Sequence, residues 1–318
     1  MLEGLESVPW SLLSHAYGPA DDVPALIRAL GSLDSKERQH ALYELYGNIW
    51  HQGTIYEATS YAVPFLLELA ADPETPERSH VLSLVGSIAE GNSFVAVHKD
   101  LPFYQTDHYA QQEKIELEWV DNTRRAVSAG WPVLIGCFEE ADHPISTAAA
   151  YVITRFPENG LEVLNLLKER FERAEADSLL QTGFMMLIKD FAAQIPGTED
   201  WARSVFLGKF ALPVRIAAAV AVARGERQRT PSDVIGFLTH HLIGNDEIDQ
   251  AFSIQPWDKL EPVPEIVDAL FLSDQGRRLA IARFNQLLGS HQDQKRLRYC
   301  DHALRNALQM ADRTTRRH

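Results

Sequence analysis

The chain has 318 residues, of which 45% are hydrophobic and 23% are charged, as in a folded, soluble protein. Its formal net charge of −14 makes nucleic acid an unfavourable partner, because an acidic surface repels phosphates, and it favours a basic protein. The N-terminal segment lacks the features of a secretory signal, and the longest uncharged run, residues 126–138, is shorter than the roughly 20 apolar residues of a membrane-spanning helix.

The two cysteines, Cys137 and Cys300, are too few for a disulfide framework, so we expect a protein of the reducing cytoplasm. Charge is spread unevenly along the chain. Residues 275–318 contain ten basic and three acidic residues, a net charge of +7, which leaves −21 for residues 1–274. Such a surplus of acid can serve solubility alone, or it can attract a basic partner.

Four segments repeat one helix-forming pattern: an apolar residue, a proline, and then aliphatic residues at helical spacing. They are "VPALIRAL" from Val23, "VPFLLELA" from Val63, "WPVLIGCF" from Trp131 and "VPEIVDAL" from Val263. Apolar residues at i, i+3, i+4 and i+7 form one stripe of an α-helix. A proline at the second position suits the first turn, where its missing N–H has no intrahelical acceptor. Each segment is therefore predicted to begin a helix.

A second predicted helix follows several of these segments and begins with an acidic residue and an arginine. Examples are "DSKERQHALYELYGNI" from Asp34 and "ETPERSHVLSLVGSIA" from Glu74. Arg38 and Arg78 are 40 residues apart, which is in the period range of helical repeat proteins. Small residues in these second helices would let neighbouring helices approach closely; they include Ser83, Gly86 and Ala217 to Ala219.

Signals for β-strands are weak, since no two-residue alternation persists and no Asn-Gly hairpin occurs. The predicted fold is therefore all-α: a single α-solenoid of about six or seven helix pairs over residues 1–318. Two insertions are predicted, at about residues 91–125 and 244–262. A capping helix at about residues 293–318 is predicted to close the array.

The helix-pair motif resembles the HEAT repeat. The resemblance is carried by Leu33 and Asp34, followed by Arg38 and Ala41, behind a helix that opens with proline. It implies that Asp34 with Arg38, and Asp274 with Arg278, occupy positions at which an aspartate and an arginine commonly interact between successive repeats. Two repeats depart from this motif, because Glu74 precedes Arg78 and Asp142 is followed by Ser146. Together with "HAYG" and "HQGTIYEAT", the motif resembles a group of bacterial HEAT-repeat proteins of mostly unassigned function.

The join between the second and third predicted helices is rich in chemically versatile side chains. The second helix is expected to end at about His51, with Gly53 in the left-handed conformation that ends helices. Thr54 and Glu57 have the spacing of a capping box for the third helix. Turns between helices border the binding surface of a solenoid, so this join supplies candidate binding residues: Trp50, His51 and Tyr56.

The first insertion provides the other candidate binding residues. Residues 91–107 are predicted to form a long loop that carries Phe94 and His98, and residues 108–129 a helix. The candidates are Phe103, Tyr104, Glu113, Glu116 and Trp119. Aromatic side chains beside acids could anchor a basic partner, because aromatic residues dominate binding hot spots. The alternative is that the loop folds back and fills the concave side of the solenoid, with Phe103 and Tyr104 in the core.

No catalytic, phosphate-binding, dinucleotide or zinc motif occurs, and no cofactor or metal is predicted. The favoured hypothesis is a non-catalytic, protein-binding solenoid that sequesters a basic protein, in an immunity or regulatory role. The alternative is a HEAT-like nucleic-acid-binding protein or DNA-repair glycosylase, since some HEAT-like proteins are glycosylases with an aromatic cleft and a carboxylate. A third hypothesis is a lyase-type solenoid that binds a small pigment.

Overall fold

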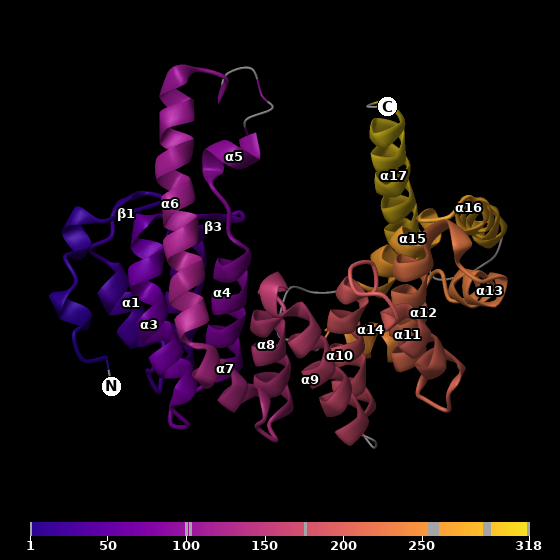
Figure 1. The fold of residues 1–318 in the computed structure, drawn as a ribbon, viewed down its shortest axis with the longest axis horizontal. Coiled ribbons are helices and arrows are strands. Elements are labelled where there is room, and N and C mark those ends of the chain that lie inside the picture. The colour runs from indigo at the N-terminus through magenta and orange to yellow at the C-terminus, as the bar shows by residue number, and fades with distance from the viewer. Residues whose placement is uncertain are drawn as a thin grey trace. The chain divides into compact units, whose positions relative to one another are not determined.

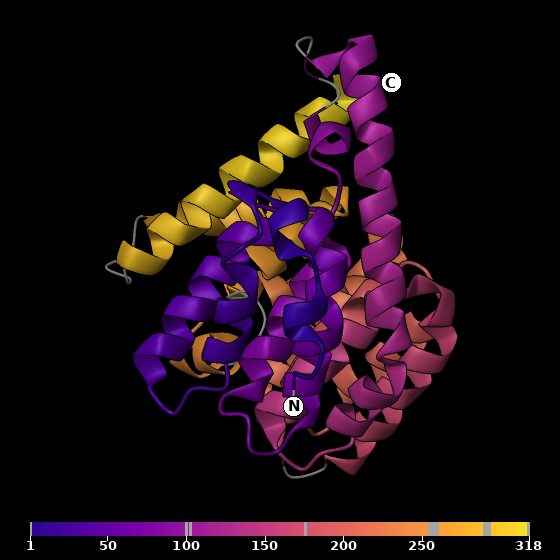
Figure 2. The ribbon, with the colours of Figure 1, turned by 90° about the vertical axis from the view of Figure 1, so that its left-hand side faces the viewer.

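The computed structural model describes residues 2–98, 101, 104–174, 177–253, 261–288 and 294–316. These residues are predominantly α-helical, and the strands among them are only two residues long, which confirms the all-α prediction (Figures 1 and 2). No helix in this part of the chain is long and apolar enough to cross a membrane. The chain divides into two compact units, which we call unit 1 (Met1–Glu158) and unit 2 (Asn159–His318).

Unit 1 is built from pairs of helices that pack in two rows. Helices α1, α3 and α7 are successive neighbours in one row, and α2, α4 and α8 are neighbours in the other. The long helix α6 packs on α3 and α4, extends beyond their ends, and carries α5 on its side (Figures 1 and 2). The elements are β1 (Ser14–His15), β2 (Gly18–Pro19), α1 (Val23–Ala29), α2 (Ser35–Asn48), β3 (Trp50–His51), β4 (Thr54–Ile55), α3 (Glu57–Ala71), α4 (Arg78–Glu90), α5 (Phe94–His98), α6 (Asp107–Ala129), α7 (Trp131–Phe138) and α8 (His143–Ile153).

Unit 2 is arranged around the central helix α12, which contacts α10, α11, α13, α14 and α15. Ala217, Ala218 and Ala219 on α12 are fully buried, so small side chains do allow close packing there. The helices are α9 (Gly160–Arg173), α10 (Ser178–Phe191), α11 (Thr198–Leu207), α12 (Leu212–Glu226), α13 (Ser232–His240), α14 (Asp246–Ser253), α15 (Pro262–Phe271), α16 (Asp274–Leu288) and α17 (Gln294–Arg316). Helix α14 lies in the second predicted insertion, and α17 occupies the region of the predicted final helix.

The join between α2 and α3 differs from the prediction. Helix α2 ends at Asn48, and strands β3 and β4 form an antiparallel hairpin. Gln52 and Gly53 have φ angles of 51° and 90°, as the two central residues of a tight hairpin turn require. The predicted continuation of α2 to His51 was wrong because pairing across the hairpin satisfies the backbone there. A second hairpin, β1–β2, was also missed.

Helix α3 begins through a different cap from the one predicted. The backbone N–H of Tyr56 donates to Thr59 Oγ1 at 2.9 Å, whereas Thr54 belongs to β4. Glu57 Oε2 accepts hydrogen bonds from the backbone and hydroxyl of Ser14, so it does not reach back to Thr54. Pro64 therefore lies inside α3, not in its first turn, which corrects the prediction for that proline. The helix continues through Pro64 because a cap fixes the helix N-terminus and because buried residues pack against the core both before and after the proline.

Ion pairs connect successive helix pairs of unit 1, with partners that differ from the expected ones. Arg38 of α2 contacts Glu77 at 3.0 Å, and Arg78 of α4 makes a bidentate pair with Glu140 at 2.9 and 2.6 Å. Arg38 also donates to the carbonyl of Ser32, just after the end of α1. In the same way, Arg78 donates to the carbonyl of Ala70, in the last turn of α3. The Arg38 guanidinium holds the pKa of Glu77 below its usual range. Asp34 instead accepts the Lys36 N–H as an N-cap.

The other expected pairs also change partners. On α16 Asp274 contacts Arg277 at 2.9 Å, whereas Arg278 is exposed. At the start of α8 Ser146 replaces the arginine, and its hydroxyl donates to the Phe138 carbonyl at 2.6 Å. A serine can therefore bind the end of the preceding helix, but it cannot reach an acid in the next pair.

We expect both cysteines to be unreactive in the folded protein. Cys137 on α7 and Cys300 on α17 are free and buried; burial raises the pKa of the Cys137 thiol and raises that of Cys300 to about 12. Because the thiolate is the reacting species, a chromogenic disulfide reagent at pH 8 should modify neither thiol until denaturant is added. Rapid labelling of Cys300 under native conditions would show that α17 does not stay packed on α15.

Candidate functional site

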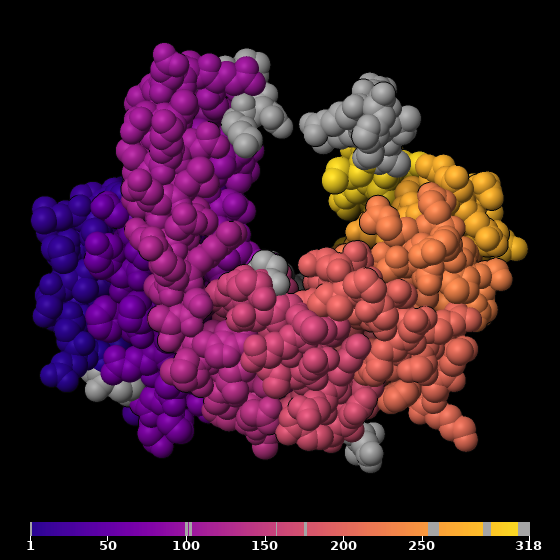
Figure 3. All heavy atoms as spheres, in the orientation of Figure 1, coloured from indigo at the N-terminus to yellow at the C-terminus, as the bar shows by residue number. Residues whose placement is uncertain are grey.

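The upper part of α6 and the short helix α5 form a projection from unit 1, which we define as residues 94–98, 101 and 104–118. Both ribbon views show α6 rising beyond the other helices of unit 1, and Figure 3 shows the same projection in space-filling form. Helix α6 contacts α3 and α4 through its lower part and α5 through its upper part. The projection therefore exposes several of its sides to solvent.

Aromatic rings connect α5 to α6. The ring centroids of Phe94 and His98 lie 4.3 Å apart, and those of Phe94 and Tyr104 lie 5.8 Å apart. Tyr104 in turn contacts Tyr109 of α6 at 4.9 Å. Edge-to-face and tilted contacts of this kind hold rings in defined orientations. The cluster therefore gives the projection a preformed aromatic surface.

Glu116 fastens α5 to α6 from below. Its side chain is only 6% exposed, and one carboxylate oxygen accepts the Ser93 hydroxyl at 2.6 Å and the Val95 N–H at 2.9 Å. The other oxygen accepts from Gln112 at 3.1 Å. A buried carboxylate that receives N–H and O–H donors at a helix start acts as a cap. Glu116, expected to bind a partner, is therefore engaged inside unit 1.

Apolar side chains on the projection remain open to solvent. Val97 is 57% exposed and Leu101 51% exposed, and Ile115 and Leu117 on α6 are exposed as well. Ile115 and Leu117 are two positions apart on a helix, so the exposed apolar side chains are spread over different sides of the projection.

The surroundings of these residues are acidic. Unit 1 contains 23 acidic and 9 basic residues, so it carries the whole net charge of −14, whereas unit 2 contains 21 of each. On α6 itself, Glu118 at the lower end of the projection and Asp121 just below it are exposed. The apolar and aromatic surface is therefore presented by the negatively charged half of the chain.

The hairpin residues predicted as candidates lie at the base of this region. Trp50 is half-buried, and its ring meets the Tyr46 ring edge-on at 5.6 Å. His51 Nδ1 lies 3.4 Å from the hydroxyl of Tyr17, which is itself exposed. Tyr56 is half-buried, and its hydroxyl lies 3.0 Å from Thr54 Oγ1.

Tyr56 links the hairpin to the projection. Burial raises the pKa of its phenol, and the negative charge of Glu116 on α6 adds to that rise. The backbone makes a second connection, because Ile55 N–H donates to the Asn92 carbonyl at 3.1 Å and Asn92 N–H donates to Gly53 at 2.9 Å. Tyr56 therefore lies within range of the Glu116 charge, although the two residues were predicted from separate segments.

The remaining candidates have mixed placements. Tyr104 belongs to the aromatic cluster, and Glu113 and Trp119 are half-buried on α6. Phe103 lies outside the described residues. The sequence prediction treated residues 91–107 as a loop and so missed α5, although Phe94 and His98 have the i, i+4 spacing of a helix.

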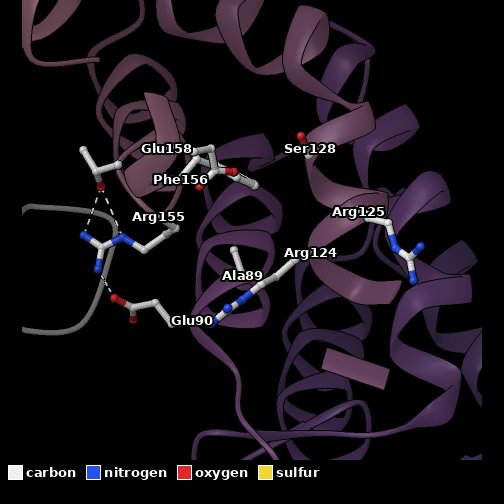
Figure 4. Close-up of a pocket in the computed structure, with 9 residues that line it drawn as sticks. Ala89, Glu90, Arg124, Arg125, Ser128, Arg155, Phe156 and Glu158 are labelled. Atoms are coloured by element: carbon white, nitrogen blue, oxygen red, sulfur yellow. Dashed lines mark hydrogen bonds and ion pairs between the residues drawn. The ribbon is translucent and has the colours of Figure 1, made fainter. Parts of the chain in front are cut away.

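A pocket of about 680 Å³ lies below the projection, between the C-terminal ends of α4 and α8 and the lower part of α6 (Figure 4). Glu90 binds the Arg155 guanidinium and accepts the Tyr151 hydroxyl at 2.9 Å. Arg124 points across the pocket toward Glu90, whereas Arg125 points away and donates to Asn122 at 2.7 Å (Figure 4). None of the described residues that line this pocket is a histidine or a cysteine, so its lining supplies neither an imidazole base nor a thiol.

Among the described residues, no group of three or more histidine, cysteine, aspartate or glutamate side chains could hold a metal ion. No family model matches the chain, and no curated protein matches it.

Proposed function

We propose that this chain is a non-catalytic binding protein, a HEAT-like α-solenoid that binds a basic protein through unit 1. The HEAT-like part of the proposal is supported by the helix pairs of unit 1 and by the pairs Arg38–Glu77 and Arg78–Glu140. These ion pairs join one helix pair to the next, as the resemblance leads us to expect of successive repeats.

The observation that carries the proposed partner is the aromatic and apolar projection on the acidic unit. Aromatic side chains held in place supply contact area at a low entropic cost. The surrounding carboxylates would steer a positively charged protein toward that surface and disfavour neutral or acidic ones. The partner is thus best described as a basic protein with an apolar or aromatic spot inside its positive surface.

Charge disfavours the nucleic-acid alternative. Unit 1 repels phosphates, and unit 2, with 21 acidic and 21 basic residues, has no net positive charge to attract them. A binding protein with this charge would occupy the basic surface of its partner and so keep the partner from other anionic ligands. Sequestration in an immunity or regulatory role is the biological form that we propose for this activity.

Reversing two charges at the base of the projection should weaken partner capture. In the variant Glu118→Lys/Asp121→Lys, both side chains are exposed and no ion pair of the described residues involves them, so the fold should be kept. The affinity for the partner should fall by at least about tenfold, because the local attraction becomes a repulsion and the negative charge of unit 1 that steers the partner is reduced. Affinity capture from the source cells with quantitative mass spectrometry, followed by titration of the recovered protein, measures this effect.

The matched control is Glu162→Lys/Glu169→Lys on α9 of unit 2, where both side chains are also exposed. It makes the same change in net charge and should leave the affinity within about twofold. Equal losses in both variants would mean that only overall charge matters, and the projection would not be the binding surface. Capture of no basic protein that depends on Glu118 and Asp121 would overturn the proposed function.

A further inference from the structure

The first arginine of α12 lies in the same place as the two arginines that join the helix pairs of unit 1. Arg215 is in the first turn of α12, as Arg38 is in α2, and its Nε donates to the Phe206 carbonyl at 3.0 Å. Phe206 is in the last turn of α11, so Arg215 binds the end of the preceding helix, as Arg78 does in unit 1. One half of the arrangement in unit 1 is therefore repeated in unit 2.

The other half, an acidic partner from the next helix pair, is missing. Glu140 lies two residues after the end of α7, whereas the residue two after the end of α13 is Leu242, which is buried and apolar. Arg215 is half-buried, and among the described residues its guanidinium forms no ion pair and no hydrogen bond other than that to Phe206. Its terminal nitrogens are therefore donors for which this part of the chain supplies no acceptor.

Two aromatic rings hold the Arg215 guanidinium in place. Its Cζ lies 4.9 Å from the centroid of the Phe237 ring on α13 and 5.6 Å from that of the Phe206 ring, and the two rings meet at 5.1 Å. The face of a ring attracts a guanidinium, but it leaves the N–H groups at the guanidinium edge without acceptors in their plane. The side chain is therefore positioned in advance for an acceptor that comes from elsewhere.

The charge around these rings favours an anion. Arg203 of α11 also lies over the Phe206 ring, with its Cζ 5.5 Å from the centroid. Its Nη2 contacts Asp233 at 2.7 Å, while its Nη1 is buried without a hydrogen-bond partner. Two arginines and one aspartate leave one positive charge in excess. The other acids of α11, α12 and α13 lie at the opposite ends of their helices: Glu199 and Asp200 in the first turn of α11, and Glu226 at the end of α12.

His241, directly after α13, borders the same cluster. Its ring centroid lies 4.8 Å from that of Phe237. Burial lowers the pKa of His241, and the positive charges of His240 and Arg215 lower it further, so the imidazole is neutral at pH 7. A neutral imidazole still carries one N–H, which can donate to an anion.

We propose that Arg215 anchors a carboxylate-binding site, in which the ligand takes the place that Glu140 fills beside Arg78 in unit 1. A guanidinium edge and a carboxylate form two parallel N–H···O bonds, the geometry that Arg78 makes with Glu140. The carboxylate has two sources, an aspartate or glutamate side chain of a protein and a free carboxylic acid. The site is in unit 2 and does not depend on the projection of unit 1.

Binding can be measured on the full chain by NMR titration with propionate at constant ionic strength. Arg215→Lys should weaken binding by at least about fivefold, because lysine keeps the charge but lacks the two-nitrogen edge. The matched control is Arg278→Lys on α16, an exposed arginine of the same unit, which should leave the affinity unchanged. No saturable binding of propionate, tighter binding of inorganic phosphate, or equal affinities of the wild type and Arg215→Lys would overturn the proposal.

A second variant tests the site without removing the arginine. His241→Glu supplies a carboxylate from the chain itself, so the affinity for propionate should fall by at least about tenfold and the melting temperature should rise by about 2–4 °C. Gln250→Glu, at an exposed position on α14, makes the same change in net charge and should leave the affinity unchanged. An unchanged affinity or a lower melting temperature in His241→Glu would contradict a carboxylate site at Arg215.

The source of the carboxylate follows from a comparison of propionate with a glutamate that is acetylated and amidated. Tighter binding of the blocked glutamate assigns the site to a protein side chain, and tighter binding of propionate assigns it to a free acid. Failure of partner capture by unit 1 would leave these measurements unaffected.

Discussion

Replacing Gly86 with alanine is expected to destabilise the protein by about 1 kcal/mol. A Cβ at this position of α4 would lie 2.4 Å from two ring carbons of Tyr151 on α8, which is closer than such atoms can approach. Tyr151 cannot easily withdraw, since it is buried and its hydroxyl is bound to Glu90. Overpacking of a dense contact costs about 1–3 kcal/mol, more than the roughly 0.5–1 kcal/mol that alanine gains over glycine inside a helix.

The matched control is Gly136→Ala on α7, where no atom lies within 4 Å of the added Cβ. Only the helix preference acts at this site, so stability should rise by about 0.5–1 kcal/mol. Denaturant unfolding of the two variants and the wild type measures both effects, and the opposite signs are the critical feature. A neutral or stabilising Gly86→Ala would mean that α4 and α8 do not approach each other as closely as described.

Replacing Lys189 with methionine should cost about 3 kcal/mol. Lys189 on α10 forms an ion pair with Glu265 on α15 at 3.4 Å, and the two side chains are only 7% and 13% exposed. The substitution leaves Glu265 with Arg224 of α12, at 3.2 Å, as its remaining ion-pair partner. Removing one member of a buried ion pair typically costs 3–5 kcal/mol, and Arg224 offsets part of this loss. For a unit of this size the melting temperature should fall by about 6–12 °C.

Two further variants separate the ion pair from other effects of the substitution. Lys209→Met changes an exposed lysine of the same unit and should alter stability by less than about 0.5 kcal/mol. Adding Glu265→Gln to Lys189→Met should recover part of the loss, because it removes the poorly compensated charge. If the double variant is less stable than Lys189→Met alone by the full cost of the second change, Lys189 and Glu265 do not interact.

Helical periodicity predicted the fold class and several helix starts because it depends on local spacing alone. Pro24 and Pro132 stand in the first turns of α1 and α7, as their flanking residues indicate. Gly86 was recognised as a place of close approach for the same reason. A small residue on the buried face of a helix implies a near neighbour even when that neighbour is unknown.

The errors occurred where contacts distant in sequence decide the structure. Arg78 and Glu140 are 62 residues apart, and no local pattern indicates that they pair. The join after α2 is a local error of another kind: its residue pattern suits a helix end, but Gln52 as well as Gly53 adopts a left-handed conformation, so a tight hairpin forms. Glu116 has the appearance of a surface acid in the sequence of α6. Only the arrival of Ser93 and Val95 above it makes it a buried cap.

The division of charge between the two units has a consequence for handling the molecule. A positively charged matrix will hold the chain by residues 1–158, because residues 159–318 offer it no net attraction. Immobilisation of that kind would hold unit 1, which carries the aromatic rings of α5 and α6, to the support. An attachment that does not depend on charge is therefore needed if unit 1 is to remain accessible to a binding partner.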